Sequence, residues 1–248
     1  MGDTMRVGVI GAGAISQVAH LPVLRKLKGV EVAAICDADF PKARALADRF
    51  QVESAFDDIE DLLENSELDA VVICTPNHLH EGHVLAALRA GLHVLVEKPL
   101  ALNTASAQRV VRAAAKKDRV VMVGMNHRYR SDVQIVRSFV QTGELGDVES
   151  VRGSWHVFRP SRAMLGWRLK RDLSGGGAML DLGLSILDLG LWLTGNPKPV
   201  RVSATLDRAG RERATEHAGS AFVVLENGAC IFVDVTWHHL GEGERFGV

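Results

Sequence analysis

The sequence predicts an α/β protein in which a doubly wound parallel sheet is followed by an α+β domain with a mostly antiparallel sheet. Over residues 1–124, short apolar runs alternate with helical stretches, and a glycine turn follows the first apolar run. This alternation stops after Gly124, where a long apolar helix and several strand-like runs take over. We therefore expect two domains, at 1–124 and 125–248, with the boundary near Met125.

The composition narrows the class of protein. The chain has 248 residues, of which 47% are hydrophobic and 24% charged, with a formal net charge of −1. This balance argues against a nucleic acid or a membrane surface as the main partner. The three cysteines show neither metal nor disulfide spacing, which favours a reducing compartment. No signal-peptide apolar region precedes the first strand, and no apolar run approaches the roughly 20 residues that span a bilayer. We expect a cytoplasmic protein.

In the first domain, short apolar runs bounded by turn residues predict buried parallel strands. A helix end is indicated by Gly91, and a helix start is indicated by Asn103 or Thr104. Six strands are expected, at residues 5–10, 30–36, 53–56, 69–74, 92–96 and 120–123, and helices at 15–27, from about 41, at 57–64, 78–90 and 103–117.

In the second domain, Glu226-Asn227-Gly228 between two apolar runs indicates a hairpin. A basic, irregular stretch at 159–171 precedes the longest apolar helix, which Gly195 ends. We expect helices at 131–141 and 178–193, a turn at 143–146, and strands at 148–157, 200–206, 220–225 and 230–236.

The turn after the first strand is typical of a dinucleotide site. Gly11 permits a tight turn, and Gly13 lets the backbone approach a pyrophosphate. The helix that begins around Ala14 and Ile15 supplies free N–H groups and a positive dipole end. Ser16 takes the third glycine position of the fingerprint and is still small. The alternative is a tight strand–helix turn without a ligand.

Asp37, just after the second strand, bears on the choice of dinucleotide. A carboxylate at this point can accept hydrogen bonds from the adenosine ribose and repels a 2′-phosphate, which favours NAD over NADP. The alternative is that Asp37 caps the helix that starts near Pro41.

Lys98 lies in Glu97-Lys98-Pro99, just past the apolar run that ends at Val96. Open α/β sheets bind ligands at the carboxyl ends of their strands, so this lysine can hold a substrate oxygen. The alternative is a solvated lysine at a strand end.

His78, His80 and His83 could suggest a metal cluster. Positions i, i+2 and i+5 do not share one helix face, and no acidic or cysteine pattern supports a metal site. We expect some of these histidines, with His80 as the candidate, to line a cofactor groove or to cap the helix.

Four motifs together resemble the glucose–fructose oxidoreductase / inositol dehydrogenase (Gfo/Idh/MocA) family along nearly the whole chain. They are GVIGAGAIS with His20 shortly after it, CTPNHLHEGHVLAALRAGLHVLVEKPL, GWRL, and SGGGAMLDLGLSILDLGLWLTG. The resemblance implies a Rossmann domain and a mostly antiparallel α/β domain whose sheet often forms a subunit interface. It also implies hydride transfer between a nicotinamide and a sugar, cyclitol or related alcohol or carbonyl.

The resemblance also implies roles for single residues. Lys98 would lie at the reacting oxygen. Asp181 would act on the substrate, and the histidine that the family often has four residues later is Ser185 here. Serine is no general base at neutral pH without an activating partner. The alternative for Asp181 is a buried carboxylate that satisfies backbone donors of the glycine loop at 175–177. The residues expected along the cofactor are Thr75, Pro76, Asn77, Glu97, Trp167 and Arg168.

Three residues are candidate substrate contacts by their position near the expected site: Asn126, Arg128 and Ser185. Arg128 could equally be a surface charge. The basic stretch at 159–171 could clamp an acidic or phosphorylated substrate, or be a solvated loop in which only Arg168 is functional.

The leading hypothesis is an NAD-dependent oxidoreductase, NADP being less favoured, that acts on CH–OH groups. One alternative is a catalytically impaired dinucleotide-binding sensor, suggested by Ser185 and the short C-terminus. Another is NAD-dependent glycoside cleavage. Family members usually run on for several dozen residues, so the sequence is either truncated or depends on dimerisation. We expect a homodimer or homotetramer through the C-terminal sheet.

Overall fold

The computed structural model describes residues 4–159, 166–208 and 215–247. Part of the basic stretch predicted to be irregular, 160–165, lies outside the described residues. The chain divides into two compact units, Met1–Gly124 and Met125–Val248.

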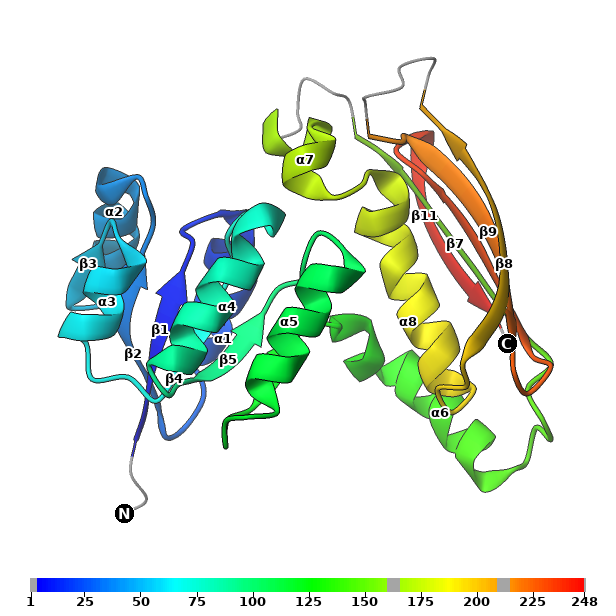
Figure 1. The fold of residues 1–248 in the computed structure, drawn as a ribbon, viewed down its shortest axis with the longest axis horizontal. Coiled ribbons are helices and arrows are strands. Elements are labelled where there is room, and N and C mark those ends of the chain that lie inside the picture. Colours follow the sequence, from blue (N-terminus) through cyan, green and yellow to red (C-terminus); the bar gives the residue numbers. More distant parts are fainter. Residues whose placement is uncertain (1–3, 160–165, 209–214, 248) are drawn as a thin grey trace. The chain divides into compact units, whose positions relative to one another are not determined.

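The first unit contains a six-stranded parallel sheet with the strand order β3-β2-β1-β4-β5-β6 (Figure 1). This confirms the predicted doubly wound sheet. The order reverses between β1 and β4, and the crevice at such a reversal is where open α/β sheets bind ligands. The strands are β1 (Met5–Ile10), β2 (Val30–Cys36), β3 (Ser54–Phe56), β4 (Ala70–Ile73), β5 (His93–Val96) and β6 (Val121–Val123).

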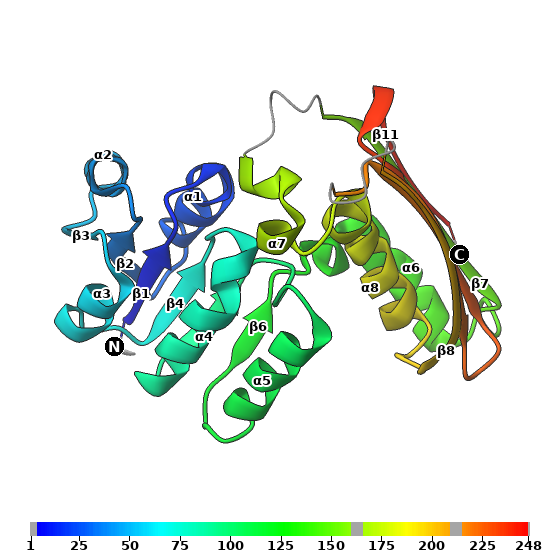
Figure 2. The same cartoon turned by 45° about the horizontal axis from the view of Figure 1, so that its top comes forward.

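Helices cover both faces of this sheet, with α1 and α2 on one face and α4 and α5 on the other (Figure 2). Each face has its own apolar core, one including Leu21 and Leu46, the other Leu88 and Val110. The first helix is split into a π-helical turn at Ser16–His20 and a short α-helix, and its α-helical part ends before residue 27. The helices are α1 (Leu21–Leu24), α2 (Phe40–Phe50), α3 (Ile59–Asn65), α4 (His80–Arg89) and α5 (Thr104–Ala114).

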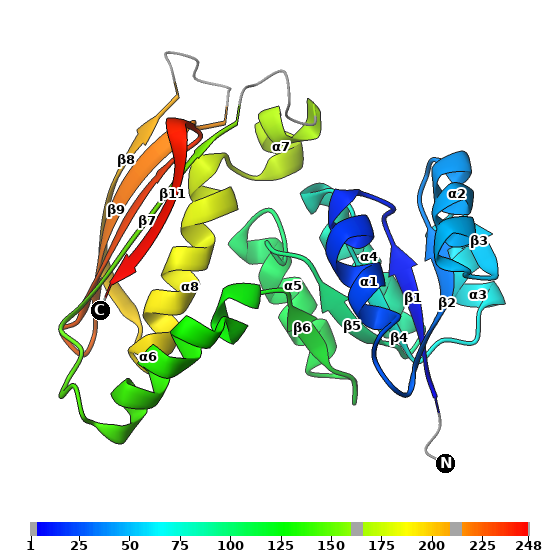
Figure 3. The same ribbon diagram turned by 180° about the vertical axis from the view of Figure 1, so that it is seen from behind.

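The second unit contains a five-stranded sheet with the order β11-β7-β10-β9-β8 (Figure 3). Among the strands of this sheet that the structure describes, β7 and β10 pair in parallel and the other pairs are antiparallel, so the sheet is mostly antiparallel, as predicted. Strand β11 was not predicted, because its sequence has glycines and charges where an apolar alternation would signal a strand. The strands are β7 (Ser150–Phe158), β8 (Pro199–Asp207), β9 (Ala218–Leu225), β10 (Cys230–Thr236) and β11 (His238–Gly247).

One face of this sheet is covered by the long apolar helix. Leu182 and Ile186 pack against Ile231 and Val233 of β10. The approach is close, since a Cβ on Gly190 would lie 2.8 Å from the Ile231 side chain. The helices are α6 (Ser131–Thr142), α7 (Arg171–Ser174) and α8 (Leu184–Leu193), and a π-helical turn at Met179–Gly183 leads into α8.

One helical segment in the described chain, 171–193, is long and apolar enough to cross a membrane by length and composition alone. The segment has 23 residues and begins before the helix expected at 178–193. Half of its most apolar window is buried within the protein. A core helix that packs on a sheet passes the same test, so the segment is weak support for a membrane span.

Candidate functional site

The turn after β1 leaves space where a ligand could approach the backbone. Gly11 has a φ of +101°, and a Cβ on it would lie 2.8 Å from the carbonyl of Cys74, so only glycine fits. A Cβ on Gly13 would meet none of the described atoms within 4 Å. The N–H groups of the first helical turn, including Ala14 and Ile15, have no partner within the helix. The turn can therefore accommodate a phosphate group.

Ser16, at the third glycine position of the fingerprint, is accommodated by a hydrogen bond to the glycine turn. Its side chain is buried, and its hydroxyl donates to the carbonyl oxygen of Gly11. Gln17 adds a second tie, from its Nε2 to the carbonyl oxygen of Ala12 at 3.1 Å. These bonds close the turn on itself and leave Gly13 at its open side.

Asp37 follows β2 and turns its carboxylate toward the glycine turn. Its Oδ2 accepts from the Ala12 N–H at 2.7 Å and from Lys42 Nζ at 3.1 Å. The alternative that Asp37 caps the next helix is wrong, since Asp39 is the N-cap of α2 and accepts from the Lys42 N–H at 3.2 Å. Asp37 is thus held at the rim of the turn, with the ammonium group of Lys42 beside it.

Glu97, at the end of β5, is held by a residue from the first helix. Its Oε1 lies 2.7 Å from Nε2 of His20, and both side chains are mostly buried. Burial alone would lower the pKa of His20, but hydrogen bonds to Cys74 and Glu97 outweigh it and raise this pKa from 6.5 to about 10. His20 therefore carries a positive charge at neutral pH, and the pair fixes the Glu97 carboxylate. The sequence motif included His20 but did not reveal this partner.

The His20–Glu97 pair predicts a pH dependence of stability. Because the pKa of His20 is about 10 when folded and 6.5 in the reference state, its contribution is complete below pH 6.5 and is lost as pH rises toward 10. We expect the melting-temperature advantage of the wild type over His20→Gln to shrink across this window. A Glu97→Gln variant should show a weaker decline, since the partner charge is gone. A pH-independent difference between wild type and His20→Gln would contradict the ion pair.

His80 braces the segment that carries Lys98. Its side chain is 1% exposed, with Nδ1 2.7 Å from the carbonyl oxygen of Pro99 and Nε2 2.8 Å from that of Thr75. At least one of these contacts is a hydrogen bond that the ring donates, and together they tie the end of β4 to the end of β5. His80 was expected along the cofactor groove, but its burial leaves no ring surface for that contact.

Lys98 therefore lies between two anchored neighbours, with Glu97 held by His20 and Pro99 held by His80. Lys98 is partly buried, and the Lys98–Pro99 peptide bond is cis. Thr75, one strand away, has its Oγ1 3.1 Å from Nδ1 of His83.

His83 is neutral at physiological pH. Burial lowers its pKa to about 4, and the neighbouring His80 and His78 act in the same direction. Among the described residues, no group of three His, Cys, Asp or Glu side chains could hold a metal ion.

In the second unit, Asp181 lies in the π-helical turn and pairs with arginines. Its Oδ2 is 2.8 Å from Arg159 Nη1, and its Oδ1 is 3.8 Å from Arg168 Nη1. The indole N–H of Trp237 donates to Oδ2 at 3.2 Å. The carboxylate is thus oriented by charged and polar groups from three separate segments.

A carboxylate other than that of Asp181 accepts hydrogen bonds from the backbone of the glycine loop. The alternative, in which Asp181 is a buried carboxylate that satisfies these donors, is therefore wrong. Oε1 of the buried Glu216 accepts from the Gly177 N–H at 2.7 Å and from the Met179 N–H at 3.2 Å. A Cβ on Gly177 would collide with the carbonyl oxygen of Glu216. Glu216 satisfies the donors at the start of the long helix and leaves Asp181 for other partners. Nothing in the sequence around Glu216 signalled this role.

The three candidate substrate contacts differ in their exposure and in their partners. Asn126 is exposed on a short 3₁₀ turn. Arg128 pairs with Asp188 of α8 through Nε at 2.7 Å and Nη2 at 2.5 Å, which makes it an anchor between segments. Ser185 is 4% exposed, so it offers almost no surface to a substrate.

Sheet order, glycine turn and strand-end acidic residue together define the first unit as a dinucleotide-binding Rossmann domain. Comparison with known families agrees. Residues 5–125 match the oxidoreductase family with an NAD-binding Rossmann fold, and residues 133–248 match the GFO/IDH/MocA C-terminal domain. The chain belongs to the Gfo/Idh/MocA family of oxidoreductases.

Individual relatives point the same way. The chain is 33% identical over 204 residues to D-glucoside 3-dehydrogenase of Escherichia coli (strain K12), covering 81% of this chain and 57% of the relative. It is 29% identical over 217 residues to scyllo-inositol 2-dehydrogenase (NADP(+)) of Bacillus subtilis (strain 168), covering 85% and 57%. The chain thus spans just over half the length of these relatives.

A solved structure shows the same fold. The crystal structure of GenD2 from gentamicin A biosynthesis, in complex with NAD, superposes with a TM-score of 0.90 at 29% identity. The superposition covers 99% of this chain and 69% of that one.

Proposed function

We propose that this chain transfers a hydride between NAD and an alcohol or carbonyl group of a sugar, cyclitol or related substrate. The observation that carries the proposal is the placement of Lys98. It follows β5 in the sheet that carries the glycine turn, and both of its neighbours are anchored by histidines. A lysine at a strand end whose two neighbours in the chain are fixed in this way is suited to hold a reacting oxygen.

The residues present fit a dinucleotide. Gly11, Gly13, Ala14 and Ile15 offer the turn and the N–H groups for a pyrophosphate. Further cofactor contacts are proposed, from family resemblance, for Thr75, Pro76, Asn77, Glu97, Trp167 and Arg168. When bound, the nicotinamide accepts or donates the hydride.

NAD is favoured over NADP because Asp37 presents a carboxylate at the rim of the turn, where it would repel a 2′-phosphate. Lys42, 3.1 Å from this carboxylate, weakens the repulsion. One relative is named as an NADP(+) enzyme, so the ratio of rates with the two cofactors is a direct measure of this balance.

Lys98 would hydrogen-bond the substrate oxygen. As an ammonium group it stabilises the negative charge that develops on oxygen during carbonyl reduction. Asp181 would orient the substrate or relay the proton, with its own position set by Arg159 and Trp237. Ser185 is buried and does not replace the family histidine as a base.

The class of substrate rests on the relatives, which are named as dehydrogenases of a glucoside and of an inositol. The test is NADH formation with a panel of polyols, aldoses and cyclitols, repeated with NADP. Oxidation of at least one of them, faster with NAD, is expected. NADH binding without turnover across the panel would instead indicate a sensor. Release of nitrophenol from nitrophenyl glycosides only when NAD is present would indicate glycoside cleavage.

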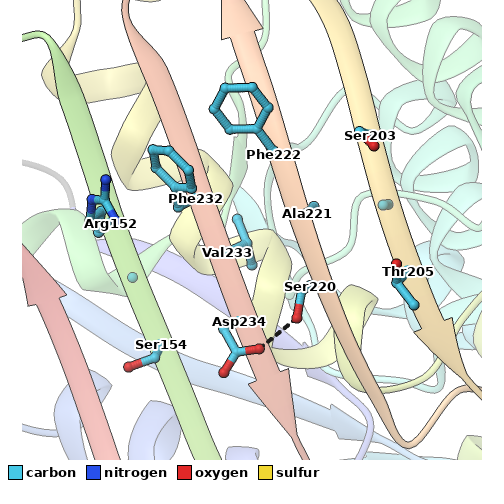
Figure 4. Close-up of a pocket in the computed structure, with 12 residues that line it drawn as sticks. Arg152, Ser154, Ser203, Thr205, Ser220, Ala221, Phe222, Phe232, Val233 and Asp234 are labelled. Atoms are coloured by element: carbon cyan, nitrogen blue, oxygen red, sulfur yellow. Dashed lines mark hydrogen bonds between the residues drawn. The ribbon is translucent and has the colours of Figure 1, made fainter.

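We also propose that the chain forms a homodimer or homotetramer through the open face of the second sheet. This face carries Phe222 and Phe232, whose ring centroids are 4.8 Å apart, and the guanidinium of Arg152 over the Phe232 ring (Figure 4). The face is hollowed by about 620 Å³. A second copy of the chain would cover these aromatic side chains.

The Phe232→Asp variant tests this interface. We expect it to have the mass of a single chain in light scattering, because a charge at the centre of an apolar interface is costly to desolvate. Phe139→Asp, on the exposed side of α6, is the matched control and should keep the mass of the wild type. A Phe232→Asp variant that remains oligomeric would rule out this face.

A cytoplasmic location is supported by the cysteines. Cys36 and Cys74 are buried, and all three cysteines are free thiols.

A further inference from the structure

Among the described residues, two arginines pair with Asp181. Arg159 lies at ion-pair distance, 2.8 Å, from Oδ2, and Arg168 lies 3.8 Å from Oδ1. Two guanidinium groups therefore share one carboxylate, which leaves one positive charge without compensation from Asp181.

Arg168 is the guanidinium that Asp181 does not satisfy. Its Nη1 lies 3.8 Å from Oδ1 of Asp181, which is too far for a hydrogen bond. Its guanidinium carbon lies over the Trp167 ring, 4.6 Å from the ring centroid. Among the described residues, no hydrogen bond from its side chain is found. Burial lowers the pKa of Arg168, Asp181 raises it and Arg159 lowers it. Arg168 is thus a partly desolvated cation whose fork of N–H donors has no acceptor among the described residues.

The basic residues of the stretch at 159–171 differ in how far water can satisfy their charge. Lys170 and Arg171 are exposed, where water satisfies their charge. Arg168 has a side chain that is 35% exposed and is oriented by an aromatic ring. A planar fork held in this way matches a carboxylate or phosphate, which accept two parallel hydrogen bonds.

We propose that Arg168, supported by Arg159, binds an oxyanion of the substrate in addition to the cofactor contact proposed above, so that the preferred substrate is an acidic sugar or cyclitol derivative. This rests on the proposed function. Asp181 offsets Arg159 and keeps it in place, while Arg168 offers its donors to the ligand. The oxyanion is a carboxylate or a phosphate, two sources that the test separates.

The test measures binding of D-glucose, D-glucuronate and D-glucose 1-phosphate to the full chain loaded with NADH, by titration calorimetry. We expect one of the two anions to bind roughly tenfold or more tightly than glucose, as one charge-assisted hydrogen-bonded pair provides. Arg168→Gln should abolish this preference, and Arg168→Lys should retain part of it. Arg171→Gln is the matched control and should behave as the wild type.

Two results would overturn the inference: anions that bind no better than glucose, or a preference that survives in Arg168→Gln. A surviving preference together with weaker NADH binding would leave Arg168 as a cofactor contact alone. Thermal melting of Arg168→Gln checks its fold. NADH formation is scored separately, so oxidation of neutral polyols without anion preference would retain the proposed function and reject this inference.

Discussion

Replacing Lys98 with methionine is expected to remove nearly all turnover while NADH binding persists. Methionine has a similar length and keeps the packing, but it can neither hydrogen-bond the reacting oxygen nor carry a positive charge. Groups that take part in proton transfer or stabilise developing charge contribute roughly 10²–10⁴-fold to the rate. The measurement is steady-state kcat with the best substrate of the panel, alongside the Kd of NADH from its fluorescence.

The exposed Lys28→Met variant is the matched control for loss of one lysine charge and should retain wild-type kcat. If Lys98→Met turns over normally, Lys98 has no part in the mechanism. A variant that loses NADH binding as well as turnover would indicate a role in positioning the cofactor or the strand end.

Replacing Gly177 with alanine is expected to destabilise the second unit severely. The added Cβ would collide with the carbonyl oxygen of Glu216 and lie 2.8 Å from its backbone nitrogen. Both are backbone atoms, so the clash cannot be relieved by a rotamer change. Movement of the loop would also break the hydrogen bonds that Glu216 accepts from Gly177 and Met179. Together these losses should exceed about 3 kcal/mol in the free energy of unfolding.

Gly166→Ala is the control, because a Cβ there would meet none of the described atoms within 4 Å. Urea unfolding curves of both variants and the wild type provide the comparison. Gly177→Ala with a midpoint equal to that of Gly166→Ala would show that the loop can move away from Glu216 at little cost.

The strands of the first sheet were readable because parallel strands covered on both faces are continuous apolar runs. The runs around Val7, Val32 and Val94 are such strands, and each is bounded by turn residues or charges. Strand β11 was not readable, since it is stabilised by pairing with β7 and its sequence has no apolar alternation. The split of the first helix into π and α segments also left no sequence signal.

The candidate site was predictable where chemistry depends on local spacing, as for Gly11 and Lys98. It was not predictable where the partner is distant in sequence. His20 and Glu97 are 77 residues apart, and Gly177 and Glu216 are 39 apart. Such pairs are formed by the tertiary fold, and neither partner has a neighbourhood that indicates the other.

The π-helical turn at Met179–Gly183 allows the direction of Asp181 to change independently of the packing of α8. An α-helix advances about 100° per residue, so one extra residue in a turn rotates the preceding residues by that angle relative to the later ones. The face of α8 that packs on the sheet is thereby uncoupled from the direction of Asp181. A single inserted residue can re-aim a carboxylate while the apolar contacts of the helix stay in register, and the π-helical turn at Ser16–His20 offers His20 the same freedom.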